Sequence, residues 1–210
     1  MNTLTNYLNL KKKDTILDLA CGRGRHSKYL YKQGFNVTGV DLSTESIAYA
    51  KQYEKTGLHF EVHDMCLPYP QRFDAVLNLF TSFGYFENES DNLKTINAIK
   101  AELKPTGSCV IDFLNVELAI KNLVPSERKK AGDIIFNIEK YVEDGYIIKN
   151  IRFNDKGKDF HYVERVKALT LEDFKLFFKE TNVTLKNVFG DYQLNTFDKN
   201  NSERLILIFN

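Results

Sequence analysis

The chain has 210 residues and a formal net charge of +1, with 43% hydrophobic and 27% charged residues. This size predicts one globular domain with a core that needs no disulfides. The balanced charge gives no indication of a nucleic-acid or anionic-membrane partner, and no apolar run reaches the length of a membrane span.

The first predicted elements are a buried strand, a turn and a helix. In the predicted strand Thr15–Ala20, the residues from Ile16 onward are apolar apart from Asp18, as in the strands of a buried parallel sheet. Gly22 and Gly24 follow, and glycine permits a positive φ and close approach of the backbone to a ligand. A helix is expected from there to about Gln33. A strand, a glycine turn and a helix in this order form a nucleotide-binding crevice.

Two cofactor classes compete for this crevice. A dinucleotide fingerprint has a third glycine where this chain has Ser27. The carboxylate of Asp18 would repel a pyrophosphate, but it would attract the sulfonium and ammonium groups of S-adenosylmethionine. The stretch Leu17–Gly24 resembles motif I of the class I S-adenosylmethionine-dependent methyltransferases. A nicotinamide-dependent oxidoreductase is the disfavoured alternative.

The second predicted strand, Phe35–Val40, ends at Asp41, about 20 residues after the first. A carboxylate at this strand end is the position that binds ribose hydroxyls in such folds. The alternative is that Asp41 only caps the next helix, expected over 44–54, but Ser43 is better placed for that role. The run Val37–Ser43 resembles the second motif of the same family.

The third predicted strand, Leu58–His63, is followed by Asp64 and Met65. In the family an acid at this strand end lies near the adenine amino group, so the resemblance places Asp64 there with the Met65 backbone as neighbour. His59 and His63 lack a third ligand, so no metal site is expected. The resemblance implies cofactor contacts for Asp18, Ala20, Gly22, Gly24, Asp41, Leu42, Asp64, Met65 and Asn78.

The fourth predicted strand, Phe73–Phe80, runs into the segment where family members bring cofactor and substrate together. It lacks the Asn/Asp-Pro-Pro-aromatic motif of amino-methylating nucleic-acid enzymes, the Pro-Cys nucleophile of cytosine-carbon enzymes and the paired acids of metal-dependent catechol enzymes. It resembles small-molecule and uncharacterised bacterial members instead. The candidates near the methyl group are Asn78, Ser82, Tyr85 and Arg165, with Asp191 and Tyr192 as weaker pocket candidates.

The remaining elements complete the fold. A helix over 91–104 is expected to end in a turn at 103–107, before a fifth strand at 108–113. The segment 116–130 is expected to be irregular or weakly helical, and turn signals separate three strands after it. The predicted elements are strands Asp133–Lys140, Tyr146–Phe153 and Phe160–Lys167, a helix from the capping-box-like Thr170 to Glu180, and strands Val183–Phe189 and Leu205–Phe209.

The cysteines and the first residues of the chain indicate the expected cellular compartment. Cys21, Cys66 and Cys109 have no metal-ligand spacing, and Met1-Asn2-Thr3 does not begin a signal peptide. A cytoplasmic protein with reduced thiols is expected. Only 15 residues precede Ile16, fewer than in relatives. This predicts a more open pocket, a pocket covered by another subunit, or inefficient turnover.

These patterns predict a single α/β domain over 1–210 with a Rossmann-like seven-stranded sheet. The expected strand order is 3-2-1-4-5-7-6, with helices on both faces and a three-stranded antiparallel meander inserted at 133–167 over the substrate side. The resemblance implies direct in-line methyl transfer from S-adenosylmethionine to an unidentified, small-molecule acceptor. The alternative is a cofactor-binding module or inactive relative that acts through protein contacts. The oligomeric state is left open.

Overall fold

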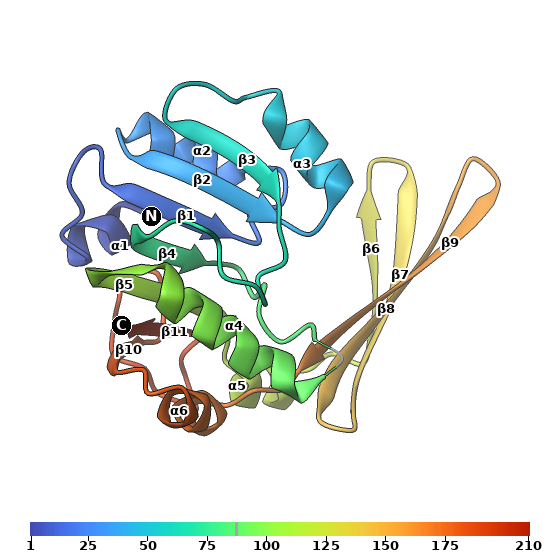
Figure 1. The fold of residues 1–210 in the computed structure, drawn as a ribbon. Helices are drawn as coiled ribbons and strands as arrows, with labels where there is room; N and C mark the ends of the chain where they lie inside the picture. The colour runs from blue at the N-terminus through green and yellow to red at the C-terminus, as the bar shows by residue number, and fades with distance from the viewer. Residues whose placement is uncertain (87) are drawn as a thin grey trace.

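The computed structural model describes residues 1–86 and 88–210, and its centre is a seven-stranded sheet (Figure 1). The strand order is β10-β11-β5-β4-β1-β2-β3, with the first five strands of the chain parallel and β10 and β11 antiparallel to their neighbours. β11 and β10 take the places expected of a seventh and sixth strand, and their labels differ because a second sheet intervenes in the chain. The strands are β1 (Thr15–Leu19), β2 (Asn36–Asp41), β3 (Leu58–Val62), β4 (Phe73–Asn78), β5 (Leu103–Leu114), β10 (Leu185–Phe189) and β11 (Arg204–Phe209).

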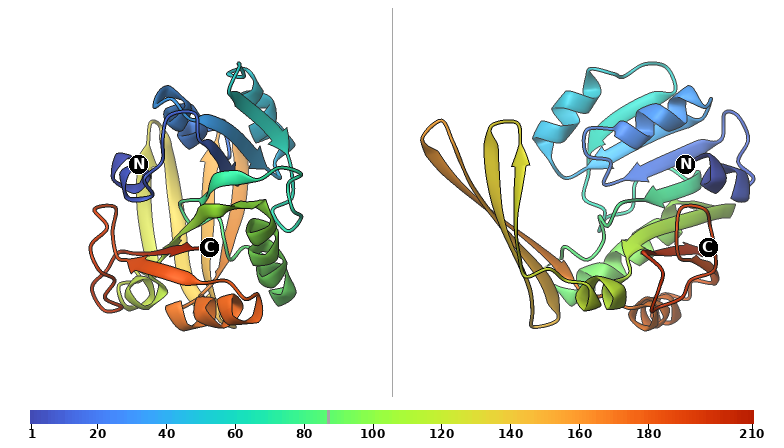
Figure 2. Two further views of the ribbon diagram at one scale, coloured as in Figure 1. Left: turned by 60° about the vertical axis from the view of Figure 1, so that its left-hand side comes forward. Right: turned by 180° about the vertical axis from the view of Figure 1, so that it is seen from behind.

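Helices cover both faces of this sheet, as predicted (Figures 1 and 2). Leu4, Leu30 and Ile47, from the first three helices, share one buried cluster with Leu77. The later helices pack into a second cluster on the other face, around Phe113. The helices are α1 (Asn2–Tyr7), α2 (Arg25–Lys32), α3 (Thr44–Lys51), α4 (Glu89–Glu102), α5 (Val116–Lys121) and α6 (Leu171–Glu180).

The helix starts show why the local sequence forms these elements. The hydroxyl of Thr170 accepts a hydrogen bond from the Asp173 N–H, and the Asp173 carboxylate accepts one from the Thr170 N–H, which is the predicted capping box. The Ser43 hydroxyl accepts from the Ser46 N–H and caps α3. Ser43, rather than Asp41, is therefore the side-chain cap of α3.

A second, antiparallel sheet projects from the main body (Figures 1 and 2). It has the order β6-β7-β8-β9 and consists of β6 (Ser126–Ala131), β7 (Ile134–Glu143), β8 (Tyr146–Asp155) and β9 (Lys158–Lys167). The prediction of three strands was wrong by one, because β6 pairs with β7 over a segment expected to be irregular. The run Glu127–Lys130 is charged and lacks apolar alternation, which is typical of an edge strand that resists further pairing.

Two predicted boundaries were wrong near the site. β4 ends at Asn78 rather than Phe80, because Phe80 and Thr81 have φ angles of 59° and 60° and leave the extended conformation. The expected turn at 103–107 is instead the start of β5, which follows α4 directly. No helix in the described part of the chain is long and apolar enough to span a membrane.

Candidate functional site

A cleft of about 360 Å³ lies at the carboxyl ends of β1, β2 and β3. Carboxyl ends of parallel strands are where ligands bind in open α/β sheets. The cleft brings together six residues nominated from the sequence: Ala20, Asp41, Leu42, Asp64, Met65 and Tyr85. The cleft is also lined by His63, Cys66, Phe86, Asn88 and Asp91.

The turn after β1 holds the two motif glycines in different surroundings. Gly22 has φ +55°, and a Cβ there would meet no atom within 4 Å, so its backbone is open to a ligand. Gly24 has φ +70°, and a Cβ there would overlap the ring of Phe60. Gly24 therefore allows α2 to pack against the sheet, and it does not line the cleft.

Asp41 joins the end of β2 to two neighbouring backbones. Its Oδ2 accepts a hydrogen bond from the Gly22 N–H at 2.8 Å, and its Oδ1 accepts one from the Ser43 N–H at 2.8 Å. An ionised carboxylate can accept about four hydrogen bonds, so two acceptor positions remain. The carboxylate thus holds the glycine turn in place and still has capacity for a ligand in the cleft.

Asp18 lies beneath the turn rather than in the cleft wall. Its side chain is buried, and the hydroxyl of Ser27 donates to its Oδ2 at 2.5 Å. Burial raises the pKa of Asp18 to about 6, against the lowering effect of the Ser27 hydrogen bonds. Ser27, which replaces the third glycine of a dinucleotide fingerprint, therefore satisfies the buried acid of β1.

Asn78, at the end of β4, has a buried oxygen that the described residues leave without a partner. The side chain has no exposed surface, and its Nδ2 donates to the Leu19 carbonyl at 3.1 Å. Its Oδ1 accepts no hydrogen bond from any residue that the structure describes. The Met65 sulfur, in the cleft wall, lies 3.9 Å from Nδ2. Asn78 is not one of the residues that line the cleft, and its Oδ1 is an oxygen that is costly to leave unpaired.

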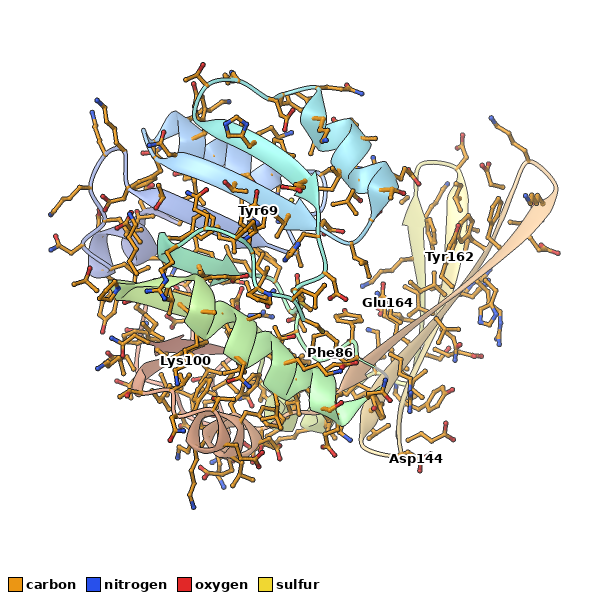
Figure 3. The ribbon with its side chains drawn as sticks, viewed as in Figure 1. Tyr69, Phe86, Lys100, Asp144, Tyr162 and Glu164 are labelled. Atoms are coloured by element: carbon orange, nitrogen blue, oxygen red, sulfur yellow. The ribbon has the colours of Figure 1, made fainter. Side chains whose placement is uncertain are left out.

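The remaining cleft residues come from the loops after β3 and β4. Asp64 Oδ1 accepts from the Cys66 N–H at 2.9 Å and shapes the turn there. Tyr85 is 49% exposed, and its pKa is raised by partial burial and by the negative charge of Glu164. Glu164 belongs to β9, on the side of the second sheet that faces the main body near Phe86 (Figure 3). The second sheet therefore borders the mouth of the cleft.

Four other candidates lie away from the cleft. Ser82 donates its hydroxyl to the Leu79 carbonyl at 2.9 Å and closes a turn. Arg165 follows Glu164 on β9, so it points to the opposite face, where its guanidinium lies 3.5 Å from the centroid of the Tyr146 ring. Asp191 accepts backbone hydrogen bonds within its own turn. Tyr192 lines a second hollow.

That second hollow has a volume of about 230 Å³ and lies at the carboxyl ends of β4 and β5. The ring of Phe80 forms part of its wall and stacks on His26 with centroids 4.9 Å apart. The Tyr192 ring stacks on Phe80 at 5.8 Å. Three rings from α2, the loop after β4 and the β10–β11 connection thus meet at one edge of the sheet.

Asp112 on β5 organises this region. Its buried carboxylate accepts from Arg204 Nε at 2.7 Å, from the Phe80 N–H at 3.1 Å and from the Tyr192 hydroxyl at 3.3 Å. The Asp112 carbonyl accepts from the Thr81 N–H, and Arg204 also donates to the Thr81 hydroxyl. The network holds two consecutive non-glycine residues at positive φ, a conformation that needs such support.

The sequence analysis missed Asp112 and Arg204 as members of the site. Asp112 stands alone in the apolar stretch Ser108–Phe113, as Asp18 stands alone in β1. A lone acid in a buried strand requires a partner, so this pattern was the available signal. Among the residues that the structure describes, no group of three or more His, Cys, Asp or Glu side chains could hold a metal ion.

Comparison with known proteins adds to this geometry. A family model described as a methyltransferase domain matches residues 16–107. The "Putative methyltransferase YqeM" of Bacillus subtilis (strain 168) is 28% identical over 209 residues, covering 94% of this chain and 84% of that protein. The glycine/sarcosine N-methyltransferase of Aphanothece halophytica is 30% identical over 150 residues, covering 68% of this chain and 57% of that enzyme.

The fold has solved counterparts. The crystal structure of an S-adenosylmethionine-dependent methyltransferase from Clostridium acetobutylicum ATCC 824 matches with a TM-score of 0.85 and 24% identity. The match covers 98% of this chain and 87% of that one. The agreement therefore extends over both sheets of the present structure.

Proposed function

We propose that this chain is a class I S-adenosylmethionine-dependent methyltransferase that transfers a methyl group from this cofactor directly to a small-molecule acceptor. The observation that supports the site most strongly is the convergence of Ala20, Asp41, Leu42, Asp64 and Met65 on one cleft. These residues were nominated on three separate strand ends. Their meeting in space is what a site for one extended ligand requires.

The residues around the cleft fit the chemical groups of S-adenosylmethionine. We assign the ribose hydroxyls to the two free acceptor positions of Asp41 and the adenine amino group to the neighbourhood of Asp64. The unpaired Oδ1 of Asn78 suits the ammonium group, because it is an acceptor that the described residues leave unsatisfied. The carboxylates of Asp41, Asp64 and Asp91 favour a cationic ligand over a pyrophosphate.

Methyl transfer from S-adenosylmethionine requires the protein mainly to position the cofactor and the acceptor. When bound, S-adenosylmethionine supplies a methyl group already activated by the positive sulfonium. The Asp41 carboxylate would fix the position of the ligand along the cleft. The rings of Tyr85 and Phe86 would favour a cation close to them. Alignment and exclusion of water can then provide most of the rate enhancement, so no acid–base pair is obligatory.

We propose that the segment 133–167, together with β6, borders the acceptor side of the cleft. This is supported by Glu164 on β9, which lies near Phe86 (Figure 3) and whose negative charge raises the pKa of Tyr85. The acceptors named for the Aphanothece relative, glycine and sarcosine, are small molecules. A net charge of +1 gives no support for a nucleic-acid substrate. The free cysteines Cys21, Cys66 and Cys109 support a cytoplasmic location.

Calorimetric titration tests the cofactor assignment. S-adenosylmethionine and S-adenosylhomocysteine should bind and raise the melting temperature through linkage to the folded state, whereas NAD and NADP should not. Release of S-adenosylhomocysteine in the presence of a panel of small acceptors then tests transfer. Binding without any release across the panel would favour the cofactor-binding module over the enzyme, and a response to NAD alone would overturn the proposal.

A further inference from the structure

We propose that a basic pocket beside α2 binds a small oligophosphate, that is, an anion with two or more linked phosphate groups. The pocket has a volume of about 360 Å³ and lies between α2 and the segment that joins α3 to β3. Both helices cover the same face of the main sheet (Figure 2). Among the residues that the structure describes, none lines both this pocket and the cofactor cleft, so the inference does not depend on the proposed function.

The lining of the basic pocket carries four cations and, within the described residues, no acid. Arg25, Lys28 and Lys32 come from α2, and Lys55 follows α3. None of these four side chains forms an ion pair with an acidic residue in the described part of the chain. Like charges gathered around one hollow repel one another, so an anion that neutralises several of them at once is favoured there.

The acidic residues nearby in the sequence have partners outside the pocket. Glu54, the neighbour of Lys55, accepts a hydrogen bond from the Phe60 N–H at 2.7 Å. Glu45 on α3 pairs with Arg23 at 3.3 Å. Neither carboxylate lines the pocket, so the lining keeps its positive charge.

Tyrosine rings hold two of the ammonium groups in place. Lys28 Nζ lies 3.8 Å from the centroid of the Tyr53 ring, and Lys55 Nζ lies 5.2 Å from the centroid of the Tyr31 ring. The hydroxyls of Tyr53 and Tyr49 hydrogen-bond to each other at 3.2 Å. A ring attracts a cation placed over its face, and a side chain held in this way loses less freedom when a ligand binds.

The chemistry of the lining selects phosphate groups. Lysine binds a phosphate as a point charge, and arginine can bind one through two parallel hydrogen bonds. A singly charged anion would neutralise one cation of the four, whereas linked phosphates carry several charges in a compact volume. Two sources share this chemistry: an inorganic oligophosphate, and the phosphate chain of a nucleotide, whose base would contact the exposed ring of Tyr29 in the lining.

The test uses the full chain and inorganic tripolyphosphate, with binding measured by calorimetry at low ionic strength. We expect tripolyphosphate to bind, and inorganic monophosphate to bind roughly tenfold or more weakly, because it neutralises fewer charges. Lys28→Gln should weaken tripolyphosphate binding by about tenfold, because it removes a charge-assisted contact. Lys186→Gln, at an exposed lysine on β10, changes the net charge equally and is the matched control, which should bind like the parent.

A second pair of variants tests the ring that holds Lys28. Tyr53→Leu removes the ring and should weaken tripolyphosphate binding by about threefold to fivefold. Tyr53→Phe keeps the ring and should bind like the parent. Equal affinities of the leucine variant and the parent would overturn the positioning role of Tyr53.

ATP distinguishes the two sources of the ligand. ATP binding that is tighter than tripolyphosphate binding, and that Lys28→Gln weakens in the same way, would identify a nucleotide; equal or weaker binding would identify an inorganic oligophosphate. In isotope-labelled protein, tripolyphosphate should shift the backbone signals of Lys28, Lys32 and Lys55, and not those of Asp41 and Asp64 in the cleft. Shifts confined to the cleft, an unchanged affinity in folded Lys28→Gln, or tighter binding of single-stranded RNA than of tripolyphosphate would overturn the assignment.

Discussion

The Asp41 carboxylate accepts a hydrogen bond from the Gly22 N–H at 2.8 Å and so ties the end of β2 to the glycine turn after β1. The same residue is our candidate for ribose binding. Asp41 therefore has a structural role and a proposed ligand role, which separate measurements can distinguish.

Asp41→Ala should weaken binding of S-adenosylmethionine by about tenfold to a hundredfold, because hydrogen bonds to a charged group contribute about 1.5–3 kcal/mol. It should also lower the free energy of unfolding by about 1–2 kcal/mol, since the Gly22 and Ser43 N–H groups lose their acceptor. Calorimetry and denaturant unfolding measure the two effects. Ser43→Ala is the control: it should cost about 1 kcal/mol of stability as a lost helix cap and leave cofactor affinity unchanged.

An affinity in Asp41→Ala equal to that of the parent, with stability reduced, would show that Asp41 only holds the turn. The ribose would then have to bind elsewhere along the cleft. Asp41→Asn keeps one acceptor oxygen, so its loss of affinity should lie between those of the parent and the alanine variant.

Asn78→Leu should reduce cofactor affinity by roughly tenfold while changing the free energy of unfolding by less than about 1 kcal/mol. The reason is that Asn78 Oδ1 is buried and accepts nothing from the described residues, so the free protein loses little when this oxygen is removed. The Leu19 carbonyl does lose the Nδ2 donor, which sets the small cost. A large loss of stability with unchanged affinity would make Asn78 a structural residue alone.

The parallel sheet and the cleft could be predicted because their signals are local. Apolar runs such as Thr15–Ala20, a following turn and an acid at the next strand end each constrain the backbone within a few residues. β6 could not be predicted in this way, because its pairing with β7 depends on backbone hydrogen bonds that its charged side chains do not reveal. The Asp112–Arg204 pair spans 92 positions along the chain, so only tertiary structure shows it.

The sequence alone also could not separate a ligand-binding role from a structural role where a residue type suits both. Gly22 and Gly24 are both glycines of the turn after the first strand, and the sequence does not distinguish them. In the structure, of these two only Gly22 is open to a ligand. Ser82 and Asp191 were polar residues in loops expected near the pocket, and both are used in their own turns. Turn hydrogen bonds of this kind are frequent for Ser and Asp, so residue type alone could not separate the two roles.

The two motif glycines give a matched pair of substitutions. Gly24→Ala should destabilise the protein by about 2 kcal/mol or more, because its Cβ would overlap the Phe60 ring and φ is positive. Gly22→Ala carries only the cost of positive φ, about 1 kcal/mol, but should weaken cofactor binding because its Cβ projects into the open approach. Thermal unfolding and titration of both variants check this contrast. Equal affinities in Gly22→Ala and the parent would place the cofactor away from this turn.

The last prediction concerns the pH dependence of stability at Asp18. Burial raises the pKa of Asp18 to about 6 in the folded protein, against an unperturbed value of 3.8. The folded state therefore retains a proton on Asp18 at pH values where the unfolded chain has released it. Above about pH 6 the charged, buried form opposes folding by its full amount, and this penalty is relieved as the pH falls from about 6 to about 4. The shift corresponds to about 3 kcal/mol.

Asp18→Asn removes the charge and keeps an acceptor for the Ser27 hydroxyl. The variant should be more stable than the parent at pH 7, and this gain in the free energy of unfolding should be about 2–3 kcal/mol larger at pH 7 than at pH 4. Asp74→Asn is a control of opposite sign: partial burial raises the pKa of Asp74, but hydrogen bonds from Lys104 and Thr15 outweigh it and lower the pKa. That variant should lose stability relative to the parent at pH 7 and approach the parent as the pH falls below about 4. Urea unfolding of the three proteins from about pH 2.5 to about pH 7.5 measures both differences. A pH-independent difference for Asp18→Asn would show that this carboxyl has an ordinary pKa.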